Sequence, residues 1–216
     1  MSSADAGHQD LRDLIRRRLA GSQPQPADRI NMPGYGDLPQ MIRRLRIRRL
    51  VPAAVLVPII DRPAGLSLLL TRRAEDLKHH PGQISFPGGR LESGDTGPAG
   101  AALRETREEV GLPEVHVEII GYLDNYLTIT GYAVTPVVAF VRPGFELELD
   151  TTEVAEAFEV PLTHVLDRER VVRRHSRFLG IRLPYFEIPY RDYNIWGATA
   201  GMLISLRQRL FEEQES

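Results

Sequence analysis

The sequence predicts an α/β fold, and three stretches of the chain carry that prediction. Residues 53–60 form a continuous apolar run rich in β-branched side chains, as in a buried strand. Residues 98–110 have apolar side chains at helical spacing, and Gly111 follows where a left-handed residue commonly caps a helix. Residues 195–211 predict a helix that closes the chain, although two glycines lower its helical propensity. Strands mixed with helices fit a layered α/β sandwich.

The remaining elements follow in order along the chain. Residues 10–19 predict a short amphipathic helix, and residues 21–39, rich in Pro, Gly and Gln, predict a loop that wraps the domain. We therefore expect an N-terminal helix and wrapping segment over residues 1–50 and a single folded domain over residues 51–216. Further strands are expected at residues 66–72, 115–125, 132–141 and 154–160 and within 171–188.

Composition narrows the class of protein. Hydrophobic residues make up 42% and charged residues 26% of the chain, which is ordinary for a soluble globular protein. Without cysteine, neither a disulfide nor a thiolate metal site can form. The net charge of −2 gives no overall attraction to nucleic acid, and the basic run at residues 43–49 is interpreted as solvated surface. No signal peptide and no membrane-spanning stretch are found, so we expect a cytoplasmic protein.

Three glutamates in the expected helix at residues 98–110 share one face. Glu105, Glu108 and Glu109 are separated by three and four positions. Carboxylates crowded in this way need a compensating cation, and hard divalent ions such as Mg²⁺ are shared between protein carboxylates and substrate phosphates. Alone, such a helix is more often a solvated face, and Gly88–Gly89 alone is an ordinary turn. Together they indicate metal-assisted chemistry on a phosphate compound.

The spacing of these residues resembles the signature of the Nudix hydrolase family. That signature has a glycine, an acidic residue six positions later, then Arg-Glu, two residues, Glu-Glu, one residue and Gly. Here Asp95 stands where Glu is usual, and eight residues rather than seven separate it from Arg104. The matching residues are Gly89, Asp95, Arg104, Glu105, Glu108, Glu109 and Gly111. The resemblance implies an α/β/α sandwich with a mixed β-sheet and a hydrolase that uses Mg²⁺ or Mn²⁺.

A second resemblance lies directly upstream. Residues 69–89 are similar to the additional signature of the coenzyme A pyrophosphatase branch: Leu-Leu-Thr-x-Arg-(Ser/Ala), three residues, Arg, three residues, Gly, three residues, Phe-Pro-Gly-Gly. Lys78 replaces the second Arg, which keeps the charge but loses the planar fork that binds phosphate. The resemblance implies cleavage of the coenzyme A diphosphate into 4′-phosphopantetheine and adenosine 3′,5′-bisphosphate. ADP-ribose or NADH as substrate, and a non-catalytic Nudix-fold binding module, are the alternatives.

The catalytic assignments rest on the first resemblance. Arg104 is expected to orient the glutamates rather than to contact substrate. Glu153 stands where the family often recruits a fourth carboxylate from a loop, and the alternative is a surface glutamate beside Asp150. Which carboxylate acts as general base is left open. The expected catalytic residues are Glu105, Glu108, Glu109, Arg104 and Glu153, and the expected metal ligands are the first three of these.

The substrate-binding assignments rest on the upstream motif, because a diphosphate needs cations and a Gly-Gly turn lets backbone approach a ligand. His79 and His80 are interpreted as polar loop residues, since neighbours on an extended chain point apart. Trp196 and Tyr132 have rings that suit adenine stacking, but core packing is the expected role. The expected substrate-binding residues are Arg73, Lys78, Gly88 and Gly89, with Arg90 as a further candidate. We expect a small-molecule partner, neither nucleic acid nor membrane, and leave open a homodimer through residues 10–49.

Overall fold

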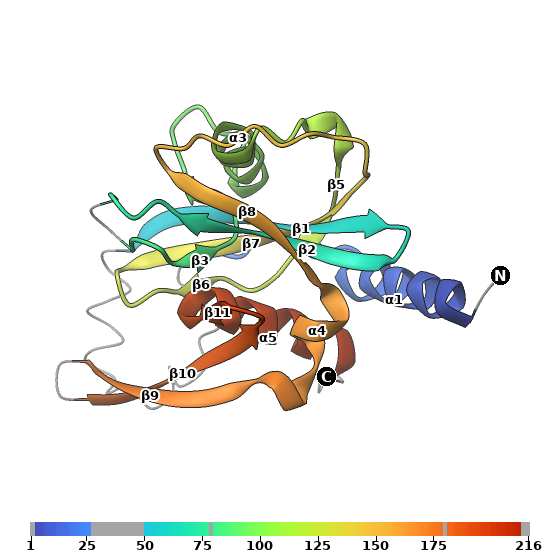
Figure 1. Ribbon diagram of the computed structural model, residues 1–216. Coiled ribbons are helices and arrows are strands. Elements are labelled where there is room, and N and C mark those ends of the chain that lie inside the picture. The colour runs from blue at the N-terminus through green and yellow to red at the C-terminus, as the bar shows by residue number, and fades with distance from the viewer. Residues whose placement is uncertain (1–2, 27–49, 78–79, 179–180, 213–216) are drawn as a thin grey trace.

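The computed structural model describes residues 3–26, 50–77, 80–178 and 181–212, which form three layers (Figure 1). A central mixed sheet has helix α3 (Pro98–Val110) on one face. The opposite face carries α1 (Ser3–Leu19), α4 (Leu162–Leu166) and α5 (Gly197–Phe211). This arrangement confirms the predicted α/β sandwich. None of the described helices is long and apolar enough to cross a membrane.

The central sheet is built around one parallel pair of strands. β1 runs parallel to β7, and the other pairings are antiparallel. The main path follows the order β3-β2-β1-β7-β5, while β4 pairs with β1, β6 with β7 and β8 with β2. The strands are β1 (Val51–Arg62), β2 (Gly65–Arg73), β3 (Ile84–Ser85), β4 (Gly88–Arg90), β5 (Val117–Tyr122), β6 (Tyr126–Leu127), β7 (Tyr132–Val141) and β8 (Val154–Pro161).

A second, three-stranded antiparallel sheet follows α4 along the chain. It consists of β9 (Val172–Phe178), β10 (Ile181–Tyr190) and β11 (Tyr193–Trp196), in the order β11-β10-β9. Figure 1 shows this sheet on the side of α5, away from α3. The predicted strands within residues 171–188 therefore belong to a sheet of their own, and the last helix begins only after a further strand, at Gly197.

The two faces of the central sheet bury separate apolar clusters because side chains alternate along each strand. In β2, Leu69 packs into the cluster under α3, whereas Leu68 and Leu70 pack into the larger cluster on the side of α1 and α5. Ala101 and Ala102, both fully buried, let α3 approach the sheet closely. The close packing of α3 fixes the position of the glutamates that the same helix carries.

Helix α1 is part of this fold rather than an appendage. It begins at Ser3, seven residues earlier than expected. Its Ile15 and Leu19 are fully buried in the larger cluster, so these two side chains are not free to form a dimer contact. Arg16 binds Glu118 of β5 through two hydrogen bonds of 2.8 Å. The division of the chain at residue 50 remains a prediction, and most of the expected wrapping loop lies outside the described residues.

Shortening Ile15 to Val is expected to lower the free energy of unfolding by about 1 kcal/mol, because it removes one buried methyl group and leaves a small cavity. Thermal unfolding should then have its midpoint roughly 2 to 4 °C below that of wild type. The matched control is Val115→Ala, since Val115 is 70% exposed and its methyl groups contribute little. Equal midpoints for Ile15→Val and wild type would show that α1 does not stabilise the core.

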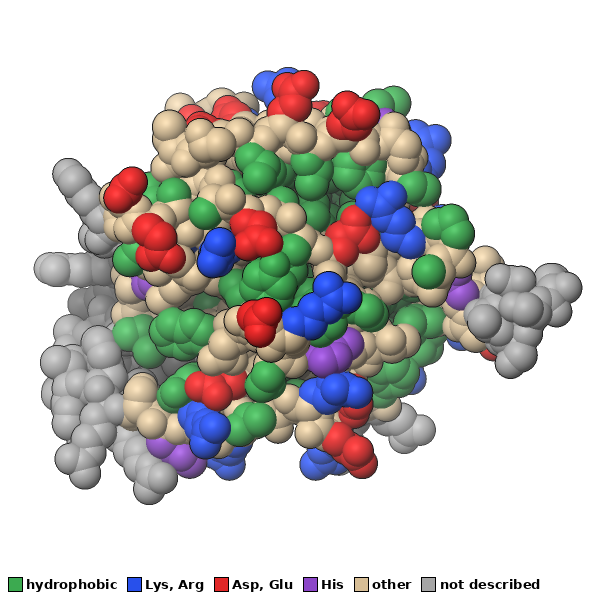
Figure 2. All heavy atoms as spheres, viewed as in Figure 1, with side chains coloured by type: hydrophobic (Ala, Val, Ile, Leu, Met, Phe, Trp, Pro, Cys, Tyr) green, Lys and Arg blue, Asp and Glu red, His purple; other side chains and the backbone are tan. Residues whose placement is uncertain are grey.

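Acidic and basic side chains are interspersed over the face of the molecule in Figure 2 rather than separated by sign. The formal charge of −2 over the whole sequence agrees with this mixture. A mixed surface of this kind creates no strong field of one sign on this face. The basic run at residues 43–49 lies outside the described residues.

Candidate metal and diphosphate site

The ends of α3 explain why the helix spans the predicted residues. Pro98 occupies the first turn, where a missing N–H costs nothing. Gly111 ends the helix with φ at 68°, and its N–H donates to the Arg107 carbonyl at 3.0 Å. Both boundaries and the left-handed cap match the sequence prediction, so the glutamates occupy the last two turns of a well-defined helix.

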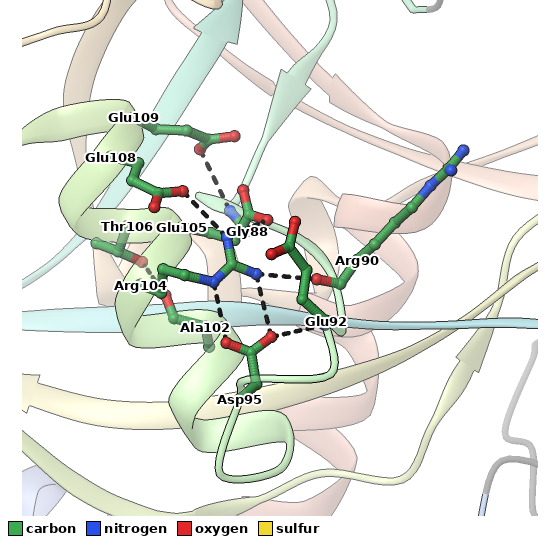
Figure 3. A network of polar contacts seen from close by, with 10 residues as sticks. All are labelled: Gly88, Arg90, Glu92, Asp95, Ala102, Arg104, Glu105, Thr106, Glu108 and Glu109. Atoms are coloured by element: carbon green, nitrogen blue, oxygen red, sulfur yellow. Dashed lines mark hydrogen bonds and ion pairs between the residues drawn. The ribbon is translucent and has the colours of Figure 1, made fainter.

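The three glutamates of α3 lie at different depths. Glu109 is 5% exposed, and its Oε2 accepts a 3.2 Å hydrogen bond from the Gly88 N–H. The side chain of Glu105 is 17% exposed, whereas that of Glu108 is 54% exposed. Figure 3 shows all three on the side of the helix that faces strand β4. The site is therefore graded from a buried carboxyl group to a solvent-facing one.

Arg104 connects this row of carboxylates to the loop before the helix (Figure 3). Its Nη1 donates to Glu105 Oε1 at 2.9 Å and to Glu108 Oε2 at 3.0 Å. On the other side, Nε and Nη2 donate to the two oxygens of Asp95 at 2.9 and 3.1 Å. Nη2 also donates to the Arg90 carbonyl at 3.2 Å. With its donors used in this way, Arg104 is placed to orient carboxylates rather than to bind a ligand.

Asp95 has a role that the sequence did not assign. It accepts from Arg104 and also from the Glu92 N–H at 2.7 Å, so it closes the loop on the helix. The hydrogen bonds from Arg104 hold the pKa of Asp95 below its ordinary value. The sequence signal that could have indicated this role is the match of Asp95 to the acidic position of the Nudix signature. Although the side chain is shorter than the usual Glu, it still reaches Arg104 with both oxygens.

Changing Asp95 to Asn is expected to weaken catalysis by roughly 10- to 100-fold, the usual effect of losing a partner that orients a metal ligand. The amide replaces one acceptor oxygen with an NH₂ group. This group is itself a donor, so it cannot accept a hydrogen bond from the guanidinium of Arg104. The rate of diphosphate hydrolysis and the affinity for Mn²⁺ should fall together. Asp124→Asn, outside this network, serves as the control. If the Asp95→Asn enzyme has the wild-type rate and affinity, Asp95 does not need to anchor Arg104 for catalysis.

Gly88 and Gly89 lie in strand β4, so the expected Gly-Gly turn is wrong, and a Cβ on either residue would meet close contacts. Gly88 has φ at 152°, and a Cβ there would lie 2.4 Å from the Ala54 carbonyl oxygen of β1. A Cβ on Gly89 would lie 2.4 Å from the carboxyl carbon of Glu105. Because β4 pairs with β1 at these residues, room for a Cβ requires a shift of this pairing at Gly88 or of the Glu105 side chain at Gly89. The Gly-Gly pair thus leaves open the space beside Glu105.

The charges of Arg73 and Glu153 affect the pKa values of the buried glutamates of α3. The pKa of Glu109 is raised to about 8, chiefly by burial; the Gly88 hydrogen bond and the charge of Arg73 oppose this rise, and the charges of Glu105 and Glu153 add to it. Burial also raises the pKa of Glu105, to which Glu108 and Glu153 add. Arg73 therefore lies close enough to act on Glu109, and Glu153 close enough to act on two of the α3 carboxyl groups.

Among the other residues considered from the sequence, Arg90, His80 and Trp196 are described by the structure, and each contacts a residue outside the α3 glutamates. Lys78 and His79 fall outside the described residues. Arg90 donates to the Tyr132 hydroxyl at 2.6 Å, and Figure 3 shows its side chain pointing away from the glutamates. His80 forms a hydrogen bond from Nδ1 to Gln83 Oε1 at 2.8 Å, as expected of a polar loop residue. The expectation that Trp196 packs in the core is wrong, because its side chain is 42% exposed.

The described residues contain no three carboxylate or imidazole groups that already converge as metal ligands. Arg104 donates from one nitrogen to an oxygen of Glu105 and an oxygen of Glu108, so these two oxygens are paired with the guanidinium. The donor set nevertheless suits a hard divalent cation, because it consists of carboxylate oxygens around a space kept open at Gly89. A cation beside Glu109 would also compensate the charge that burial disfavours.

Comparison with known proteins agrees with this geometry. The family model described as the NUDIX domain matches residues 50–179. The chain belongs to the Nudix hydrolase family. This membership supports a metal-dependent pyrophosphohydrolase acting on a small-molecule substrate, and it confirms the family that the sequence predicted. The matched segment contains β4, α3 and β8, but not α1 or α5.

The similarity of this Nudix hydrolase to curated relatives covers more of the chain than the segment that the family model matches. The uncharacterized Nudix hydrolase NudL of Enterobacter sp. (strain 638) is 40% identical over 172 residues, covering 78% of this chain and 86% of the relative. NudL of Cronobacter sakazakii (strain ATCC BAA-894) is 39% identical over 183 residues, covering 81% and 90%. Among solved structures, a Nudix hydrolase from M. Smegmatis, RenU, has a TM-score of 0.46 and 28% identity, covering 54% of this chain and 73% of its own. None of these names specifies a substrate.

Proposed function

We propose that this Nudix hydrolase cleaves the diphosphate bond of coenzyme A or one of its derivatives, giving 4′-phosphopantetheine and adenosine 3′,5′-bisphosphate. The observation that carries the proposal is the position of the upstream motif, residues 69–89. The motif ends at Gly88 and Gly89 of β4, where the Gly88 N–H donates to Glu109, and it supplies Arg73, whose charge acts on the same carboxyl group. The motif that resembles the coenzyme A branch thus borders the proposed metal site.

Glu105, Glu108 and Glu109 would hold Mg²⁺ or Mn²⁺. When bound, such an ion lowers the pKa of a water molecule and withdraws charge from the phosphoryl oxygens. Arg104 orients two of these carboxylates through its paired hydrogen bonds and is not assigned a contact with substrate. Glu153, whose charge acts on both Glu105 and Glu109, is proposed as the fourth carboxylate of the site.

Arg73 and Lys78 would neutralise the diphosphate, which carries charge that the metal alone does not balance. The Gly88 and Gly89 backbone leaves room for the phosphoryl oxygens beside the glutamates, because neither residue has a Cβ. We place the reaction in the cytoplasm, where a chain without cysteine loses nothing to a reducing environment.

The proposal is tested by incubating the purified protein with coenzyme A and Mg²⁺ and separating the products by chromatography, with ADP-ribose and NADH in parallel reactions. We expect 4′-phosphopantetheine and adenosine 3′,5′-bisphosphate in equal amounts, and no reaction after EDTA is added. Cleavage of ADP-ribose or NADH with coenzyme A left intact would contradict the substrate assignment alone. If no substrate is turned over, the chain is better described as a Nudix-fold binding module.

A further inference from the structure

A pocket of about 580 Å³ lies where β11 and the turn before it face the ends of β2 and β8. Its volume is within the range of small-molecule sites, roughly 300 to 1,000 Å³. The Gly82–Ile84 segment forms part of its wall. Its other lining residues are Arg72, Glu156, Arg191, Asp192, Tyr193, Asn194 and Trp196.

The pocket and the glutamate site border the same strand end. Arg72 and Arg73 are neighbours at the end of β2, where the pairing of this strand with β8 shifts register between them. Arg73 acts on Glu109, whereas Arg72 lines the pocket. Strand β11 packs against β3, which pairs with β2 at Arg72 and precedes β4 by two residues. Figure 1 shows β3 and β11 at the same end of the molecule. A substrate longer than its diphosphate can extend from one place to the other around this edge.

In one wall of the pocket, the side chains form hydrogen bonds, an ion pair and a ring stack with one another. The Tyr193 hydroxyl donates to Glu156 Oε1 at 2.5 Å, and Arg72 Nη2 lies 3.2 Å from Glu156 Oε2. The Tyr193 ring stacks on Phe158, with centroids 3.9 Å apart and planes 5° from parallel. The charges of Arg72 and Glu156 therefore compensate each other within the wall. Arg72 is thus not free to bind an anionic ligand, and another cation of the pocket would have to do so.

Trp196 supplies an exposed aromatic surface at this pocket. Its ring is 42% exposed, and its edge-to-face contact with Tyr185, at 6.0 Å between centroids, holds the ring in place. Indole faces stack well on nucleobases. The neighbouring Asn194 is exposed and offers both a donor and an acceptor to a base edge.

Arg191 adds a cation in an unusual conformation. It is the first residue of the two-residue turn between the paired Tyr190 and Tyr193, with φ at 52°, where glycine or asparagine is favoured. Its guanidinium lies 5.1 Å from the centroid of the Tyr190 ring, and among the described residues it forms no ion pair. Arg191 thus places a cation at the edge of the pocket, which suits a ligand with negative charge.

We propose that this pocket binds the adenosine 3′-phosphate end of the substrate, with Trp196 stacked on the adenine and Arg191 paired with the 3′-phosphate. The inference rests on the proposed function, because it assigns one end of coenzyme A to a place beside the hydrolytic site. It makes Trp196 and Arg191 determinants of substrate affinity rather than of the chemical step.

Fluorescence tests binding directly, because Trp196 is the only tryptophan in the chain. Titration with adenosine 3′,5′-bisphosphate should quench the emission to saturation, whereas 4′-phosphopantetheine should leave it unchanged. Arg191→Gly should weaken binding of adenosine 3′,5′-bisphosphate about tenfold, because a charged hydrogen bond to the 3′-phosphate is lost. Binding of AMP, which lacks the 3′-phosphate, should not change. Its thermal midpoint should stay at or above that of wild type, because glycine relieves the strained φ. Quenching by 4′-phosphopantetheine alone would overturn the proposal.

Kinetics test the same assignment during turnover. Trp196→Ala should raise KM for coenzyme A about tenfold with kcat nearly unchanged, as expected when binding to ground state and transition state is lost equally. Trp196→Phe should restore most of the affinity. The control is Phe211→Ala, since Phe211 is 50% exposed at the far end of α5. By the helical rise, Phe211 lies about 20 Å from Trp196.

The two proposals fail in different ways. If coenzyme A is cleaved but Trp196→Ala and wild type have equal KM values and the bisphosphate does not quench, the pocket assignment is overturned and the hydrolase assignment stands. If coenzyme A is not cleaved but adenosine 3′,5′-bisphosphate quenches and Arg191→Gly weakens it selectively, the pocket assignment stands without the proposed reaction.

Discussion

Replacing Glu108 by Gln is expected to abolish hydrolysis while leaving the fold intact. Loss of a metal-ligand charge removes several kcal/mol of stabilisation from the developing phosphoryl charge, which corresponds to a fall in kcat on the order of 10³-fold. The fold should survive because the Glu108 side chain is 54% exposed and the amide oxygen of Gln still accepts from Arg104 Nη1. The measurement is the steady-state rate with saturating Mg²⁺, together with circular dichroism.

The control for this variant is Glu114→Gln, which also removes one exposed carboxylate but lies beyond the end of α3. It should retain the wild-type rate. Titration calorimetry with Mn²⁺ adds a second readout, because Glu108→Gln should bind the ion more weakly than either wild type or the control. Full activity of Glu108→Gln would refute the assignment of Glu108 as a metal ligand.

Replacing Gly88 by Ala is expected to have the largest effect on stability. The new Cβ would lie 2.4 Å from the Ala54 carbonyl oxygen and 2.6 Å from Val55 Cα, and φ at 152° is unfavourable for any side chain. Backbone strain and overlap each cost of order 1 to 3 kcal/mol, so a loss of about 3 kcal/mol is expected. The midpoint of thermal unfolding should fall by roughly 6 to 12 °C.

Gly94→Ala is the matched control for Gly88→Ala. Gly94 lies in the loop before α3, and a Cβ there would meet nothing within 4 Å. Its thermal midpoint should stay close to that of wild type. A Gly88→Ala protein as stable as the Gly94→Ala control would show that β4 does not press against β1 as described.

The sequence predicted α3 and most of the long strands because their signals are local. Pro98, the spacing of alanines and Gly111 define the helix without reference to the rest of the chain. The strands at residues 132–141 and 154–160 were recognisable from apolar β-branched runs, and they appear as β7 and β8. Strands of two or three residues, such as β3 and β4, have no periodicity to detect.

The depths of the site residues depend on tertiary contacts, so the sequence could not rank them. Helical spacing places Glu105, Glu108 and Glu109 on one side, but the burial of Glu109 and the hydrogen bond that it accepts from the Gly88 N–H of β4 depend on tertiary contacts. The exposure of Trp196 likewise follows from its place in a hairpin that lies at the molecular edge. A lone tryptophan carries no sequence signal that separates a core residue from a ligand-facing one.

The central claim is that residues 69–89 adapt a Nudix metal site to coenzyme A. A competition assay tests it most directly, because substrates mixed in one reaction are consumed in proportion to their kcat/KM values. Coenzyme A, ADP-ribose and NADH would be supplied at equal concentration with Mg²⁺, and the loss of each followed by chromatography. We predict that coenzyme A disappears first and yields 4′-phosphopantetheine. Earlier depletion of ADP-ribose or NADH would contradict it.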